Sequence, residues 1–108
     1  MKFVEIKTTF EKEDEAKEMA EFLLDRKLVS CAQIFELESH YVWRNERFVE
    51  HEYMLLMKSR GGKFFKKVER AIKEKHSYEV AEIIATPICA LSKEYAKWIE
   101  ENTGGWGK

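Results

Sequence analysis

The residues best suited to chemistry gather in one short stretch. His76-Ser77-Tyr78-Glu79, followed by Glu82, places an imidazole, a phenol and two carboxylates within seven positions. Such a group can bind a ligand or move a proton. A structural role is the alternative, since a histidine in the last turn of a helix interacts favourably with the helix dipole and a tyrosine there can pack. The residue types alone leave both interpretations open.

A second candidate is a pair of histidines on two successive strands. If the chain turns at Asn45-Glu46, the strand ladder places His40 opposite His51. Two opposed imidazoles can bind a divalent transition metal. Two solvated histidines on the outside of a hairpin are the alternative.

The two cysteines favour a reduced, packed environment. Cys31 and Cys89 are far apart, without the spacing of a CxxC motif. Both fall among apolar neighbours near strand ends, where a free cysteine behaves as a small hydrophobic residue. We found no signal-peptide pattern near the first residues, so we expect a cytoplasmic protein.

Composition narrows the class of protein. The 108 residues form a single domain, residues 1–108, and 19 basic against 20 acidic side chains leave a net charge of −1. That balance argues against binding to nucleic acid. Charged residues interrupt every apolar run, so we expect no membrane span.

Hydrophobic periodicity predicts the elements that position these residues. Alternation indicates strands over residues 2–9, 29–43, 48–59 and 80–88, and helical spacing indicates helices over 12–27, 62–76 and 92–101. This order predicts an α+β fold, a ferredoxin-like split βαβ sandwich (βαββαβ) with a short C-terminal helix. Pro87 is expected on an edge strand, because it cannot donate to a ladder. A tail that ends in Trp106 follows the last helix.

The central hairpin is too long for its domain. Arms of about 14 residues would extend about 45 Å, whereas a domain of this size has a radius of gyration of about 13 Å. The arms should therefore project and expose strand edges, which soluble proteins usually pair or cover. We expect a homo-oligomer closed by strand pairing.

Several segments taken together resemble the CutA divalent-ion tolerance family: residues 28–32 (LVSCA), 41–43 (YVW), 58–59 (KS), 76–83 (HSYEVAEI) and 95–98 (YAKW). The resemblance implies a cytoplasmic homotrimer linked to tolerance of copper and other divalent ions. The family's trimers resemble the PII signalling proteins, which bind small effectors in clefts between subunits. The resemblance does not imply an enzyme or a definite cofactor. It does imply a small-molecule effector or a protein partner.

The cleft residues that the resemblance implies are Cys31, Trp43, Lys58, His76, Tyr78, Glu79 and Glu82. This mixed set suits a polar or anionic ligand, or a soft metal. Some members of the family have an assigned copper site. The positions that match its ligands hold Lys7, Lys75 and His76 here, so His76 is the one metal ligand that remains. Direct binding of copper or another divalent metal by His76 and Cys31 is the alternative function. A third hypothesis, an enzyme with His76 as its base, would require a pH-dependent activity.

Overall fold

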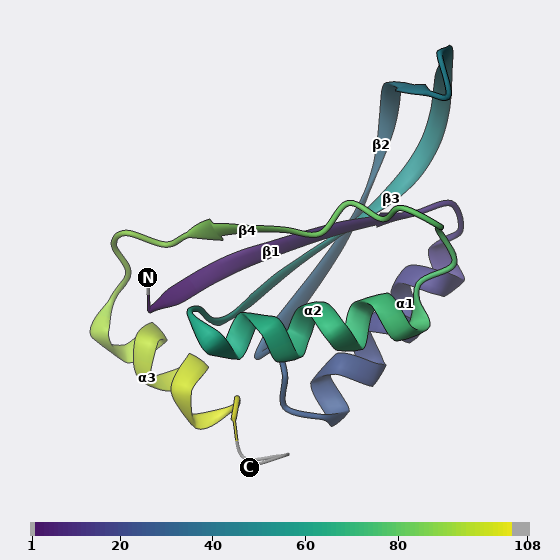
Figure 1. Ribbon diagram of the computed structural model, residues 1–108. Coiled ribbons are helices and arrows are strands. Elements are labelled where there is room, and N and C mark those ends of the chain that lie inside the picture. Colours follow the sequence, from purple (N-terminus) through teal and green to yellow (C-terminus); the bar gives the residue numbers. More distant parts are fainter. Residues whose placement is uncertain (1, 105–108) are drawn as a thin grey trace.

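A computed structural model describes residues 2–104 (Figure 1). The elements in chain order are β1 (Phe3–Phe10), α1 (Glu13–Asp25), β2 (Cys31–Trp43), β3 (Glu46–Arg60), α2 (Lys63–Lys75), β4 (Ile84–Pro87) and α3 (Lys93–Glu101). This order confirms the predicted ferredoxin-like α+β fold. The tail with Trp106 lies outside the described residues. Within residues 2–104, no helix is long and apolar enough to cross a membrane.

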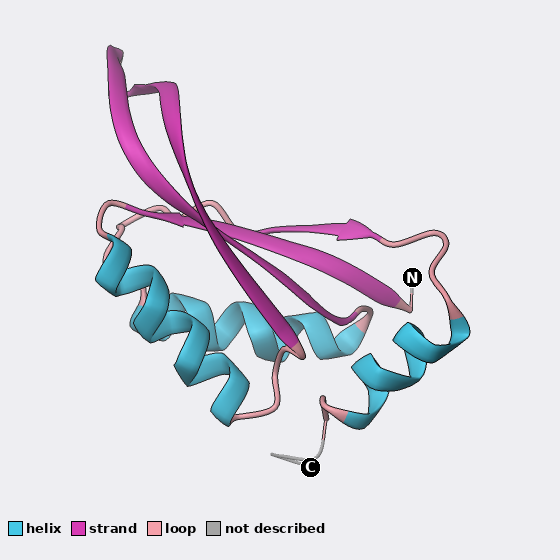
Figure 2. Cartoon of the chain, turned by 180° about the vertical axis from the view of Figure 1, so that it is seen from behind, coloured by secondary structure: helices cyan, strands magenta, loops and turns pink. Residues whose placement is uncertain are grey.

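The four strands form one antiparallel sheet in the order β2-β3-β1-β4. The helices α1 and α2 cover one face of this sheet (Figure 2). Val4 and Ile6 of β1 are buried on that face together with Leu55 and Met57 of β3, because the side chains of a strand alternate between its two faces. The opposite face, which we call the open face, carries Glu5 and the other alternate positions.

The fourth strand is shorter than predicted. It covers Ile84–Pro87 only, and residues 77–83 before it are irregular. The alternating pattern of residues 80–83 therefore does not mark a strand, because no neighbouring strand pairs with these residues. Pro87 pairs with Val4 on an edge strand, as predicted.

The hairpin formed by β2 and β3 projects beyond the rest of the sheet (Figures 1 and 2). β1 pairs with β3 only as far as Tyr53. Beyond that point, residues 46–52 of β3 and 37–43 of β2 pair only with each other. The longest dimension of the chain is 44 Å, so the predicted projection of the hairpin is confirmed.

The turn of this hairpin is not where we predicted it. It lies at Arg44-Asn45, whose φ angles of 52° and 68° are both left-handed, as a tight two-residue hairpin turn requires. His40 consequently pairs with Val49, and His51 with Glu38. The register differs from our prediction by two residues, which leaves every side chain on the same face, so hydrophobic alternation could not detect the error.

The two histidines are therefore diagonal neighbours, and the expectation of an opposed pair is wrong. Each contacts a carboxylate: Nε2 of His40 lies 2.6 Å from Oε2 of Glu38, and Nε2 of His51 lies 3.3 Å from Oε1 of Glu36. No group of three or more metal-ligating side chains within residues 2–104 is arranged to hold an ion. The opposed pairing on which the two-histidine metal hypothesis depended is therefore absent, and the alternative of two exposed histidines on the hairpin agrees with the structure.

Candidate functional site

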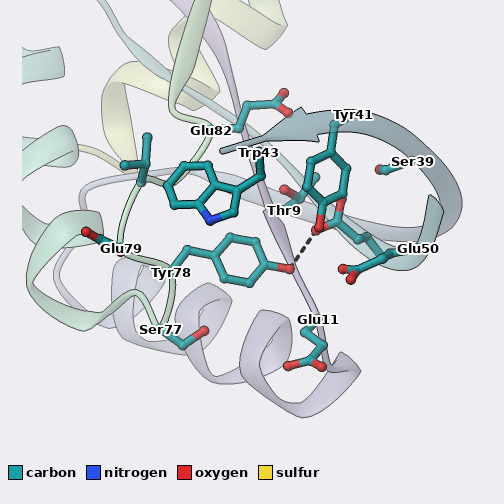
Figure 3. Close-up of a pocket in the computed structure, with 12 residues that line it drawn as sticks. Thr9, Glu11, Ser39, Tyr41, Trp43, Glu50, Ser77, Tyr78, Glu79 and Glu82 are labelled. Carbon is teal, nitrogen blue, oxygen red and sulfur yellow. Dashed lines mark hydrogen bonds between the residues drawn. The ribbon is translucent and has the colours of Figure 1, made fainter. Parts of the chain in front are cut away.

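A cavity of about 490 Å³ lies on the open face of the sheet, beneath the projecting hairpin (Figure 3). Its walls come from the end of β1, the distal halves of β2 and β3, and residues 77–82 between α2 and β4. Segments far apart in the sequence thus meet in one site. Its volume is within the range of small-molecule sites.

The strand register explains how β2 and β3 supply their share of the wall. Tyr41 and Trp43 alternate along β2, so both point to the open face. Glu50 pairs with Ser39 on the same face, and Glu52 follows two positions later. Two aromatic rings and two carboxylates are therefore displayed side by side along the hairpin.

Tyr78 joins the irregular segment to this hairpin. Its hydroxyl donates a hydrogen bond of 2.6 Å to Oε2 of Glu52, which is only 7% exposed. Burial, followed by the hydrogen bond to Glu52 and the negative charge of that carboxylate, holds the pKa of Tyr78 well above its ordinary value. Tyr78 is therefore a permanent donor at neutral pH. Sequence analysis missed Glu52, because its alternating position does not distinguish it from the exposed glutamates of the same strand.

The ring of His76 is held from both sides. Nε2 donates to the carbonyl oxygen of Thr9 at 2.9 Å, and Nδ1 accepts from the backbone N–H of Tyr78 at 3.0 Å. The ring also stacks on Phe10, with centroids 4.2 Å apart. Burial lowers the pKa of His76 despite the bond to Thr9. The ring is thus neutral with both nitrogens engaged, and in this arrangement it offers no lone pair to a metal ion or to a substrate proton.

The residues predicted for one cleft fall into two groups. Trp43, Tyr78, Glu79 and Glu82 line the cavity. His76 is not part of the lining but contacts the backbone of Thr9, which is. Cys31 and Lys58 do not belong to it. They pair across β2 and β3 near the other end of the sheet, where Nζ of Lys58 lies 2.6 Å from Oε1 of Gln33 and 3.8 Å from Oε2 of Glu5.

This separation prevents Cys31 and His76 of one chain from binding the same copper ion. Lys58, the partner of Cys31, aligns with Glu5 of β1, whereas His76 contacts Thr9 of β1. Four residues of strand span about 13 Å. Metal ligands must lie within about 2–2.3 Å of their ion. A site built from both residues would require two copies of the chain.

The cavity is acidic. Its described lining holds five carboxylates, from Glu11, Glu50, Glu52, Glu79 and Glu82, and no lysine or arginine. The expectation of an anionic ligand relied on Lys58, which lies elsewhere. Within one chain this cavity repels anions and attracts cations.

The fold and the site together define a ferredoxin-like α+β protein with a projecting hairpin and an acidic, aromatic cavity beneath it. The chain belongs to the CutA1 divalent ion tolerance protein family, whose sequence pattern matches residues 4–102. It is 38% identical over 97 residues to the divalent-cation tolerance protein CutA of Thermus thermophilus. The aligned region covers 89% of this chain and 93% of that relative.

Solved structures agree with this assignment. CutA1 from Oryza sativa superposes with a TM-score of 0.91 at 25% identity, covering 97% of this chain and 96% of that one. The periplasmic divalent cation tolerance protein CutA from Archaeoglobus fulgidus gives a TM-score of 0.89 at 32% identity, covering 93% and 97%. The resemblance inferred from the sequence is confirmed.

Proposed function

We propose that this chain forms a homotrimer in the cytoplasm and contributes to tolerance of divalent cations, copper among them, as a non-enzymatic ligand-binding or regulatory protein. The projecting hairpin is the observation that carries the proposal. Its distal strands pair only with each other, so their outer edges present unpaired backbone groups. Pairing with further copies of the chain would satisfy these groups.

The open face supports the same assembly. Phe35 is 47% exposed there, beside the partly exposed Leu37, Met54 and Leu56. Adjacent apolar side chains on a part of the sheet that neither α1 nor α2 covers are typical of a surface buried on association. Association would also bring the Cys31 and Lys58 end of one copy towards the cavity of another, as a PII-like cleft between subunits requires.

A binding role fits the contacts of His76 better than catalysis does. A general base needs a nitrogen that faces the substrate proton, whereas both nitrogens of His76 bond to the protein's own backbone. Direct copper binding by His76 would break one of these two bonds. A resident small molecule, or a partner protein, would therefore connect the trimer to metal tolerance indirectly.

Native mass spectrometry of protein purified from cells, followed by titration with copper, tests this proposal. We expect a trimer that retains a small molecule and shows no saturable binding of copper. Saturable copper that disappears in both Cys31→Ser and His76→Gln, and persists in the exposed control His40→Gln, would support direct metal binding instead. A monomer would contradict the proposed assembly.

Cell fractionation tests the proposed compartment. The relative from Archaeoglobus fulgidus is described as periplasmic, so the cytoplasmic assignment of this chain needs its own measurement. We expect the protein in the cytoplasmic fraction, together with a cytoplasmic marker enzyme. Release with the outer-compartment fraction would contradict the proposal.

A further inference from the structure

We infer that the layer formed by α1 and α2 is a docking surface for a second copy of the protein, held by opposite charges on the two helices. The inference goes beyond the proposed function and does not use the open face. Three observations carry it: the two helices present charges of opposite sign, the charged surfaces have similar lengths, and most of their charges form no ion pair within the described chain.

The outer surfaces of α1 and α2 differ in the sign of their charges. On α1, the side turned away from the buried residues carries four exposed carboxylates at helical spacing, which we call the acidic stripe: Asp14, Glu18, Glu21 and Asp25. The same side of α2 carries four exposed cations, which we call the basic stripe: Lys63, Lys66, Arg70 and Lys73.

The third helix shows that this separation is not a general property of the chain. The exposed positions of α3 mix both signs, as is usual for a solvated helix surface: Lys93, Glu94, Lys97 and Glu101. A surface that only needs to be soluble does not require one sign on α1 and the other on α2.

The residues of opposite charge on α1 and α2 lie at the sides of the stripes. At 100° per residue, Lys17 of α1 and both Glu69 and Glu74 of α2 are rotated away from the outermost line of their helix. Lys17 pairs with a carboxylate of its own helix at 3.8 Å. Glu69 pairs with Nζ of Lys66 at 3.7 Å and of Lys73 at 3.1 Å, so these two cations are partly neutralised.

The other stripe charges are unpaired. Within residues 2–104, neither Lys63 nor Arg70 nor any carboxylate of the acidic stripe forms an ion pair. The two stripes also neutralise each other only weakly. The helices lie side by side on one face of the sheet (Figure 2), and axes of packed helices are about 8–10 Å apart, which is about one Debye length at physiological ionic strength.

A second copy can bring the stripes into direct contact. A two-fold axis in the plane of the layer, midway between the helices, places the acidic stripe of each copy on the basic stripe of the other. The lengths agree, because at 1.5 Å per residue the stripes extend about 17 Å and about 15 Å. A polyanion such as a nucleic acid fits less well, since the acidic stripe beside the basic one would repel it. The layer and the open face lie on opposite sides of the sheet (Figure 2), so this contact and the proposed trimer use different surfaces.

Sedimentation equilibrium of the full chain in its native assembly tests the inference at about 20 mM and about 300 mM sodium chloride, because salt screens contacts between exposed charges. We expect the mass at low salt to rise with protein concentration to at least about twice the mass at high salt. Glu18→Lys/Glu21→Lys and Lys63→Glu/Arg70→Glu each replace attractive contacts by repulsive ones, so both should keep the high-salt mass at low salt.

Two further sets of variants separate charge pairing from net charge. The variant with all four substitutions restores complementary stripes at an unchanged net charge, so it should associate again. The controls Glu94→Lys/Glu101→Lys and Lys93→Glu/Lys97→Glu make the same changes in net charge on α3 and should associate like the parent. Circular dichroism checks that each variant is folded. The mass at high salt reports the proposed trimer independently.

Four outcomes would overturn the inference. They are a parent mass that does not depend on salt, association that persists in both stripe variants, an equal loss of association in the α3 controls, and no recovery in the fourfold variant. A parent that does not self-associate but binds poly-L-glutamate, with loss in Lys63→Glu/Arg70→Glu, would assign the basic stripe to an acidic protein partner instead.

Discussion

The hydroxyl of Tyr78 and the carboxylate of Glu52 form a hydrogen bond of 2.6 Å that ties the segment between α2 and β4 to the projecting part of β3. These residues are 26 positions apart, and Glu52 is almost fully buried. Because β1 does not pair with β3 beyond Tyr53, side-chain contacts of this kind position the base of the hairpin. The shape of the cavity depends on this bond.

Replacing Tyr78 by Phe tests that dependence. The change leaves Oε2 of Glu52 without its donor, so we expect the free energy of unfolding to fall by about 1–2 kcal/mol. Urea denaturation followed by circular dichroism measures it. In a double-mutant cycle with Glu52→Gln, the two losses should not add, and additive losses would show that the two side chains do not stabilise each other.

His76 makes stability depend on pH. Its pKa is lowered from the ordinary 6.5, so below about pH 6.5 the unfolded chain binds more protons than the folded chain. The free energy of unfolding should be constant with respect to this group above pH 6.5, and should fall as the pH decreases through the lowered pKa. Denaturation curves between pH 5.5 and pH 7.5 measure the trend.

The variant His76→Gln is the control for this dependence. Its amide can donate to Thr9 and accept from Tyr78 but does not titrate, so the slope between pH 5.5 and pH 7.5 should become smaller. The exposed His40 and His51 remain in both proteins, and their contribution cancels in the comparison. An NMR titration that places the pKa of His76 above 6.5 would contradict the predicted burial effect.

The hairpin turn offers a stabilising substitution. Asn45 has a φ of 68°, which glycine adopts without the steric cost of a Cβ atom. Asn45→Gly should raise the free energy of unfolding by about 0.5 kcal/mol, whereas Asn45→Val should lower it by about 1–2 kcal/mol. Thermal denaturation ranks the three proteins. A valine variant as stable as the parent would indicate that the turn lies elsewhere.

Arg60 anchors the C-terminal helix to β3. Its Nη2 donates to the carbonyl oxygens of Glu100 at 2.7 Å and Thr103 at 3.1 Å, and its Nε donates to Oγ1 of Thr103 at 2.8 Å. Lysine keeps the charge but cannot make these hydrogen bonds together, so Arg60→Lys should lower the free energy of unfolding by about 1–3 kcal/mol. Hydrogen exchange should accelerate in α3 more than in α1. The control Lys97→Arg, on the exposed side of α3, should leave both the free energy of unfolding and the hydrogen exchange of α3 unchanged.

The open face provides a test of assembly. Phe35→Glu places a charge on the apolar part of this face, where burial between copies would cost several kcal/mol. We expect light scattering to show a smaller species, with the circular dichroism spectrum of a folded chain. Phe35→Leu, which keeps the apolar character, should preserve the assembly. An unchanged mass in Phe35→Glu would exclude Phe35 from the interface.

The sequence by itself was sufficient for the order of the elements and for the family. Hydrophobic periodicity is local, so the α+β order, the edge position of Pro87 and the excess length of the hairpin could all be read from neighbouring residues. The segments that resemble the CutA family are likewise contiguous. Of the predicted cleft residues, Trp43, Tyr78, Glu79 and Glu82 do line one cavity.

Tertiary structure decided what depends on pairing between distant segments. The hairpin register moved by two residues without changing any face, and that shift alone separated His40 from His51. Cys31 and Lys58 lie at the far end of the sheet, because the direction of β2 and β3 carries them away from the cavity. The burial of Glu52 beneath Tyr78, and the two bonds that occupy His76, arise only when the segment after α2 packs against β1 and β3, since no local pattern records which distant backbone a side chain will meet.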